Sequence, residues 1–231
     1  MYYFDYTYLI FIVPALIISI FAQIKVKSTF KKYSGIRSKR NITGREVADR
    51  ILSYNGISQV GVTKILGNFN DHYDPRDDII RLSENVYNSS SISAVGVAAH
   101  ESGHAIQKHQ QYSPMKLRGA LVPVVNFSSS LSFPLIFIGF LLPVEFDFII
   151  YLGIILFSAC VLFELIKLPV EINASKRALV TLEEMNILDE EELSGARKVL
   201  SAAAFTYVAA TFTSIMNLFR FIFLASGRRK D

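Results

Sequence analysis

The stretch Ser91-Ile-Ser-Ala-Val-Gly-Val-Ala-Ala-His-Glu-Ser-Gly-His-Ala-Ile106 decides the fold, because it joins a small-residue apolar helix to the pattern His-Glu-x-x-His. Residues four apart lie on one helix face, so the imidazoles of His100 and His104 can reach one metal ion. Glu101 lies beside that ion without occupying a coordination site, and it can take a proton from a metal-bound water. A zinc ion with three protein ligands keeps a position open for that water and polarises a carbonyl. The stretch therefore predicts a catalytic site with one Zn2+ per chain; an ordinary helix with two histidines is the alternative.

Long uncharged runs indicate a protein that spans a membrane. The chain has 231 residues, of which 51% are hydrophobic and 19% charged, and the apolar residues are concentrated in a few segments. A bilayer span needs about 20 apolar residues, and four runs approach this length: 6–24, 120–143, 148–163 with an extension to 168, and 200–219. The first run has no base before it and a basic segment behind it, the reverse of a signal peptide, so we interpret it as an uncleaved anchor. For the last run, which is rich in Ala and Thr, a buried core helix is the alternative.

The distribution of charge predicts how these runs cross the membrane. Residues 1–24 contain no Lys or Arg, residues 25–118 contain fifteen, and the loop 144–147 has two acids and no base. By the positive-inside rule, the amino terminus and that loop face outward, and the segment with the metal helix lies in the cytoplasm. The net charge of +4 then reflects contact with anionic lipid headgroups, and no basic stripe with interleaved aromatic residues suggests nucleic acid. The bases at 228–230 favour a final helix that turns back, with a full crossing as the alternative.

The soluble piece between the first two spans is small. Thr43-Gly-Arg-Glu46 is a capping box that opens a helix to about Tyr54. Short strands are expected at Val60–Leu66 and Ile79–Leu82, with Asp74–Asp78 as a turn. A strand just before the metal helix can hold an extended peptide by main-chain pairing.

The third metal ligand has to come from elsewhere in the chain. Glu171 follows the third apolar run directly, on the same side of the membrane as the metal helix, and we favour it. His72 and Glu164 are rivals: the first lies in a polar loop, and the second is an acid within an apolar helix, where charge is costly. His109 is disfavoured because it lies nine residues after His100, near the opposite helix face.

The order His-Glu-x-x-His, two-span hairpin, Glu-x-x-Ala-Ser resembles the membrane-bound gluzincin peptidases of the HtpX and CAAX-prenyl-protease families. It is more closely similar to the YugP-type neutral zinc metallopeptidases of bacterial membranes. This similarity covers nearly the whole chain and rests on these segments: Asp71-His-Tyr-Asp-Pro-Arg76, Ile80-Arg-Leu-Ser83, Val86-Tyr-Asn-Ser-Ser90, Val95 to Gln107, Lys116-Leu-Arg118, Leu168-Pro-Val-Glu171, Ala174-Ser175 and Val199-Leu-Ser-Ala-Ala203. The resemblance implies zinc held by His100, His104 and Glu171, with Glu101 as the catalytic base, and it defines no particular substrate.

One position departs from the wider gluzincin pattern. Those families carry Asp four residues after the ligand Glu, where it orients a zinc-bound histidine. Here the residue is Ser175, which can bond an imidazole N–H but adds no charge, so Asn173, Asp77 or Asp78 are alternative partners. The group that stabilises the oxyanion is open as well, and the candidates are Arg177, Tyr207 and His72.

These observations predict a mainly α (α+β) integral membrane protein. A zincin-like catalytic domain with a short β-hairpin and the His-Glu-x-x-His helix is joined to three to four transmembrane helices. The expected order is an N-terminal transmembrane anchor (1–24), a cytoplasmic zincin-like region (25–119), a transmembrane hairpin (120–168), a third-ligand helix region (169–199), and an apolar C-terminal helix, membrane-embedded or re-entrant, with a basic tail (200–231).

The predicted function is that of a multi-pass cell-membrane zinc endopeptidase with its site facing the cytoplasm. Its partners would be the lipid bilayer and a peptide or membrane-protein substrate, with no nucleic acid. An inactive zinc-binding membrane scaffold is the alternative. The oligomeric state, the physiological substrate and the regulation are not set by the sequence.

Overall fold

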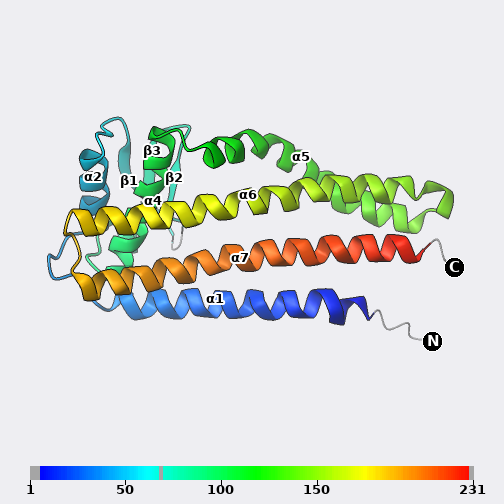
Figure 1. Cartoon of the computed structure of the whole chain (residues 1–231), viewed down its shortest axis with the longest axis horizontal. Coiled ribbons are helices and arrows are strands. Elements are labelled where there is room, and N and C mark those ends of the chain that lie inside the picture. Colours follow the sequence, from blue (N-terminus) through cyan, green and yellow to red (C-terminus); the bar gives the residue numbers. More distant parts are fainter. Residues whose placement is uncertain (1–5, 68–69, 229–231) are drawn as a thin grey trace. The chain divides into compact units, whose positions relative to one another are not determined.

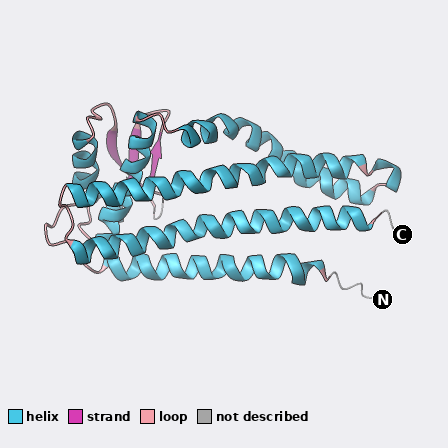
Figure 2. Ribbon diagram, viewed as in Figure 1, coloured by secondary structure: helices cyan, strands magenta, loops and turns pink. Residues whose placement is uncertain are grey.

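The computed structural model describes residues 6–67 and 70–228, and most of them are helical (Figure 2). Four helical segments are long and apolar enough to cross a membrane: 8–34, 113–141, 144–184 and 190–227. The elements follow one another in this order (Figure 1): a π-helical turn Tyr8–Ile12 that continues into α1 (Val13–Ser34), α2 (Gly44–Tyr54), β1 (Gly61–Ile65), β2 (His72–Asp74), β3 (Ile79–Ser83), α3 (Glu84–Tyr87), α4 (Ile92–His109), α5 (Ser113–Leu141), a 3-10 turn Val144–Phe146, α6 (Phe148–Glu184) and α7 (Glu190–Gly227).

The chain divides into two compact units. The first, which we call the helical unit, contains the described residues of 6–22, 117–168 and 206–228. The second, which we call the mixed unit, contains residues 23–116 and 169–205 and therefore includes the three strands. The result is the α+β membrane protein that the sequence predicts, with four candidate spans.

Glycines let two helices of the helical unit approach closely. A Cβ atom at Gly139 of α5 would lie 2.5 Å from Ile150 Cγ1, and one at Gly153 of α6 would lie 2.9 Å from the Ser132 carbonyl oxygen. Small residues at such contacts allow close packing where the hydrophobic effect does not drive helices together. Apolar side chains of α5, α6 and α7 complete the core of this unit: Ile136, Ile150, Ile154, Phe157, Val161, Phe221 and Ala225.

The last helix does not turn back. α7 runs unbroken from Glu190 to Gly227, and Arg228 follows it beside the loop between α5 and α6. The Arg228 guanidinium donates to the carbonyls of Gly139, at 2.6 Å, and Leu142, and its Nε lies 3.4 Å from the buried Asp147. A cation at a helix C-terminus satisfies its free carbonyls and interacts favourably with the helix dipole. The chain therefore has no bend within α7, and the crossing of a membrane by this helix stays a prediction.

The mixed unit packs α2 and α4 on a small sheet. The strand order is β1-β3-β2, with β1 parallel and β2 antiparallel to β3. α2 begins at the expected capping box, in which Thr43 and Glu46 bond each other's backbone. The core contains fully buried side chains from the helices and from β3, among them Val47, Ile51, Ile80, Leu82 and Val95. The expected strands correspond to β1 and β3, whereas β2, only three residues long, was not predicted, and it forms the hairpin with β3.

Candidate metal centre

Three side chains from two helices of the mixed unit converge on one point. His100 and His104 come from α4 and Glu171 from α6, and their ligand atoms all lie within 4.8 Å of one another. Glu171 Oε2 is 3.3 Å from His100 Nε2 and 3.4 Å from His104 Nε2. The side chains are 12%, 9% and 4% exposed, in the order His100, His104, Glu171. The structure thus brings together the ligands that the sequence favours.

The spacing of these atoms fits a zinc ion. Nitrogen and oxygen ligands lie about 2.0–2.1 Å from zinc in a tetrahedral arrangement, so two such ligands are about 3.3–3.4 Å apart. The distances from Glu171 Oε2 to the two imidazole nitrogens match this separation. The electrostatics also favour a cation: burial alone lowers the pKa of His104, but the nearby Glu171 and Glu101 carboxylates raise it overall. Two neutral imidazoles and one carboxylate are a donor set that zinc accepts and that leaves a fourth position open.

A glycine makes the convergence possible. A Cβ atom at Gly103, between the two histidines, would lie 2.5 Å from the carbonyl oxygen of Ala174 and 3.1 Å from its carbon. The backbones of α4 and α6 are therefore in contact where they cross. Because Glu171 lies one turn before Ala174 on α6, this contact holds the carboxylate against the two imidazoles.

Gln107 orients His104, and the sequence analysis did not identify it. Its Nε2 donates to the Val170 carbonyl at 2.8 Å and to Asn173 Oδ1 at 2.9 Å. With both amide hydrogens used, its Oε1 accepts from His104 Nδ1 at 3.0 Å. This arrangement fixes the imidazole tautomer and leaves Nε2 with a lone pair for the metal. The signal in the sequence was a glutamine one helical turn after His104. It looks like the start of a polar tail, although the structure buries it fully.

Ser175 is the partner of the other histidine. His100 Nδ1 lies 3.0 Å from Ser175 Oγ, so the ring N–H donates to the hydroxyl and Nε2 is again free for the metal. Of the alternative partners, Asn173 accepts from Gln107 and from Arg177 Nε. Asp77 and Asp78 bond Arg81 and Lys108 instead. Both supports of the metal-binding histidines are therefore neutral side chains.

Glu101 is held by the sheet. The backbone N–H of Tyr73, in β2, donates to Glu101 Oε2 at 2.9 Å. Tyr73 thus directs its N–H away from β3, the strand that pairs with β2 in the described sheet, and towards α4. Glu101 is 7% exposed and directly follows His100 on α4.

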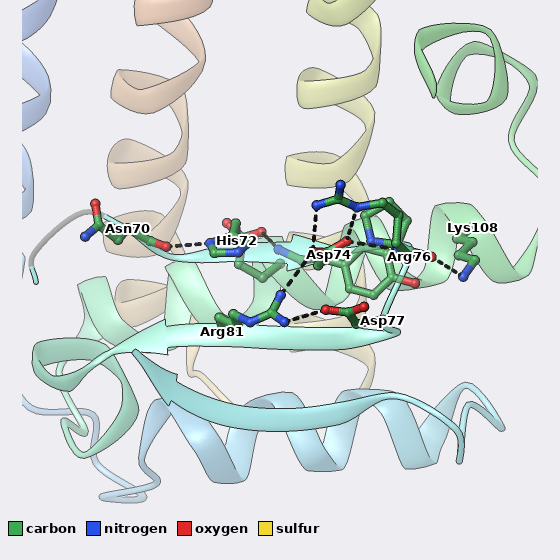
Figure 3. A network of polar contacts seen from close by, with 10 residues as sticks. Asn70, His72, Asp74, Arg76, Asp77, Arg81 and Lys108 are labelled. Carbon is green, nitrogen blue, oxygen red and sulfur yellow. Dashed lines mark hydrogen bonds and ion pairs between the residues drawn. The ribbon is translucent and has the colours of Figure 1, made fainter. Parts of the chain in front are cut away.

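The remaining candidates have other surroundings. His72 Nδ1 lies 2.7 Å from the Asn70 carbonyl oxygen on an exposed part of β2 (Figure 3), and His109 ends α4; neither belongs to the ligand group among the described residues. Arg177 bonds Asn173 and Gln110 and lies 5.7 Å from the Tyr112 ring centre. Glu164 and Tyr207 belong to the helical unit, where Lys167 lies near both.

The class that fits this arrangement is that of membrane-associated zinc metallopeptidases. It combines buried imidazole and carboxylate groups that can bind a metal, a glutamate held beside them (here Glu101) and long apolar helices. Within this class, the chain belongs to the family described as "Putative neutral zinc metallopeptidase", whose model matches residues 8–226. The chain is 47% identical over 219 residues to the "Putative membrane protease YugP" of Bacillus subtilis (strain 168). The match covers 95% of this chain and 96% of that protein. No solved structure matches the chain. The family resemblance predicted from the sequence is confirmed.

Proposed function

We propose that this protein is a zinc-dependent endopeptidase that hydrolyses peptide bonds at the cytoplasmic face of a cell membrane. The observation that carries the proposal is the geometry of one site. The Glu171 oxygen lies at the separation of a tetrahedral zinc site from each of the two imidazole nitrogens, all three ligand atoms lie within 4.8 Å of one another, and the carboxylate of Glu101 is fixed beside them. A purely structural zinc site would have no need of that oriented carboxylate, because structural sites are closed by four protein ligands.

His100, His104 and Glu171 would hold the zinc, which when bound polarises the scissile carbonyl and acidifies water. Glu101 has the role of general base. Its Oε2 is occupied by the Tyr73 N–H, so Oε1 is the oxygen left to take the proton from the attacking water and later deliver it to the leaving amine. Gln107 and Ser175 keep the two imidazoles in the tautomer that binds metal. Arg177 belongs to the polar chain behind His104, through Asn173, which favours a supporting role over contact with the oxyanion.

The outer edge of β2 is the proposed binding place for the substrate backbone. In an antiparallel strand, the N–H and C=O of one residue point to the same side. Because the Tyr73 N–H points away from β3, its carbonyl does so too and can accept an N–H from an extended peptide. The peptide would then lie along β2, next to Glu101. Most strands of a folded protein already pair with their neighbours, so the expected substrates are unfolded or extended segments.

We further propose that the protein is multi-pass, with the helical unit in the bilayer and the mixed unit in the cytoplasm. Fifteen bases lie within residues 25–118 and none within 1–24, which favours this orientation. Arg220, the base that directly follows the last apolar run, donates to Thr7 Oγ1 at 3.0 Å and lies over the Tyr8 ring, so its charge has a polar and an aromatic partner. The enzyme would therefore act on segments close to the inner membrane surface.

The test compares purified wild-type protein with Glu101→Gln. The variant should keep about one zinc per chain, because the amide is nearly isosteric and is not a ligand. Its hydrolysis of an unfolded protein such as casein should fall by at least about 100-fold, the size of a lost general base. Glu183→Gln, the same change at an exposed position of α6, is the matched control and should behave as wild type. Equal cleavage by Glu101→Gln and wild type would refute the assignment of the base.

A further inference from the structure

A lysine two turns beyond Glu101 connects the metal helix to the turn of the hairpin. Lys108 Nζ donates to both carboxylate oxygens of Asp78, each at 2.8 Å, and to the Pro75 carbonyl at 2.6 Å (Figure 3). Asp78 in turn accepts the phenolic O–H of Tyr73 at 2.6 Å. Lys108 is four residues after His104 and seven after Glu101, so all three lie along one face of α4.

Tyr73 is therefore tied to α4 at two places. Its backbone N–H bonds Glu101, and its hydroxyl reaches Lys108 through Asp78. On the helix these two attachment points are about 10 Å apart, because seven residues advance the axis by 1.5 Å each. Two attachments at this separation fix both the distance of β2 from α4 and its direction along it.

The charges and protonation states suit this arrangement. The hydrogen bond from Lys108, together with that from Tyr73, holds the pKa of Asp78 below its usual range, so the carboxylate is ionised at neutral pH. Burial, followed by the bond to Asp78, raises the pKa of the Tyr73 phenol, which therefore remains a donor.

The hairpin itself is stiffened by a separate set of contacts. Asp74 accepts from the Arg76 backbone N–H at 2.9 Å and from Arg81 at 3.2 Å, and Arg81 also reaches Asp77 at 2.7 Å (Figure 3). These bonds join β2, the turn and β3 to one another, but none of them reaches α4. A stiff hairpin moves as one body, so the contacts of Lys108 can set its position.

We propose that Lys108, Asp78 and Tyr73 form a brace that positions β2 and, through the Tyr73 N–H, the catalytic carboxylate of Glu101. The inference rests on the proposed peptidase function, because the brace matters for a base and for a peptide-binding edge. It assigns a purpose to the segment Asp71-His-Tyr-Asp-Pro-Arg76 that the metal ligands do not explain. The three residues are positioning residues, and none of them touches the metal ligands. β2 has three residues and lies at the edge of the described sheet, so its position along α4 depends on contacts outside the strand ladder.

The decisive variant is Lys108→Met, which keeps the apolar stem and removes the ammonium group, and Lys108→Arg is its conservative counterpart. Lys108→Met should lower kcat for an unfolded substrate by about 10- to 100-fold, because small misplacements of catalytic groups have effects of this size. Its zinc content should stay at the wild-type value and its melting temperature should change little, since Lys108 and Asp78 are 40% and 31% exposed and such pairs stabilise weakly. Lys108→Arg should recover most of the rate.

Lys64→Met is the matched control. Lys64 of β1 forms a comparable exposed pair with Glu84, at 3.2 Å, but this pair does not involve α4, so the variant should keep wild-type kcat and KM. Hydrogen–deuterium exchange provides a readout without activity: residues 70–78 should exchange faster in Lys108→Met and not in Lys64→Met.

The outcomes test the brace and the proposed peptidase function separately. Unchanged kcat and unchanged exchange in Lys108→Met would overturn the brace, as would a loss of zinc or a large drop in melting temperature that Lys108→Arg does not repair. If the wild type cleaves nothing while the exchange difference is present, the peptidase proposal fails and the mechanical link between Lys108 and β2 remains.

Discussion

Adding one methyl group at Gly103 should disrupt the metal centre from a position that is not a ligand. The new Cβ atom would lie 2.5 Å from the Ala174 carbonyl oxygen, 3.1 Å from its carbon and 3.3 Å from its Cα. Ordinary contacts begin near 3.4 Å, so α4 and α6 would have to separate by about 1 Å, and the obstacle is backbone that cannot rotate away. Overpacking of this kind is expected to destabilise by about 1–3 kcal/mol, which exceeds the gain of about 0.5–1 kcal/mol from replacing Gly by Ala in a helix.

The same displacement acts on the ligands. Zinc sites tolerate ligand distances within about 0.2 Å of the preferred value, whereas a shift of about 1 Å would carry Glu171 out of reach of an ion held by His100 and His104. We expect the zinc affinity of Gly103→Ala to fall by at least about 100-fold, more than typical changes in the groups around a metal site produce. Affinity would be measured by competition with a chromophoric chelator and stability by thermal unfolding of the zinc-free protein.

Gly96 of the same helix provides the control. A Cβ atom there would meet Ala196 Cβ at 3.7 Å, an ordinary contact, so Gly96→Ala should raise the melting temperature slightly and leave zinc binding unchanged. The two variants make the same chemical change on one helix and are expected to have opposite effects. A Gly103→Ala protein that binds zinc as tightly as the wild type and melts at the same temperature would refute the reasoning.

Two further predictions follow from the geometry. Zinc affinity should differ among three variants: Glu171→Ala should remove binding, and Glu164→Ala should leave it unchanged. Gln107→Leu should weaken binding by about 10- to 100-fold, because His104 loses its support. An equal effect of Gln107→Leu and Glu164→Ala would show that Gln107 does not belong to the site. The membrane crossing of α7 can be tested with single cysteines in a chain whose native cysteine is replaced. A cysteine at Ser226 should react with impermeant reagents in intact cells, while one at Ser113 should stay protected. Protection of both would argue against a full crossing by α7.

The convergence of the candidate metal ligands could be predicted from sequence because it depends on local spacing. His100 and His104 lie four residues apart on a helix, which fixes their common face wherever the helix packs. Glu171 needed only the additional idea that a two-helix hairpin returns the chain to its starting side. The long helices could be predicted for the same reason, since apolar length is a property of each segment alone.

The features that were missed depend on partners far away in the chain. β2 has three residues, too few for a period-2 pattern, and it exists because β3 pairs with it and Glu101 accepts its N–H. Gln107 looks like a surface residue until Val170 and Asn173 bury it. The positive-inside rule places Arg228 on the cytoplasmic side, yet Asp147 and two carbonyl groups at the end of α5 surround it. A rule that counts bases by segment cannot include such a local partner.

The motifs His-Glu-x-Gly-His and Glu-x-x-Ala-Ser lie on the two sides of one crossing between α4 and α6, and each position in them has a separate physical reason. On α4, His100 and His104 point at the metal position and Gly103 removes the side chain that would keep α6 away. On α6, Glu171 would supply the third ligand, Ala174 presents its backbone to Gly103, and Ser175 one residue later contacts His100. Moving Ser175 by a single residue would rotate its hydroxyl by about 100° around α6 and leave His100 without a partner. The spacing Glu-x-x-Ala-Ser is therefore set by the same contact that sets His-Glu-x-Gly-His, and a larger side chain at Gly103 should weaken metal binding more than the loss of a group that supports a ligand.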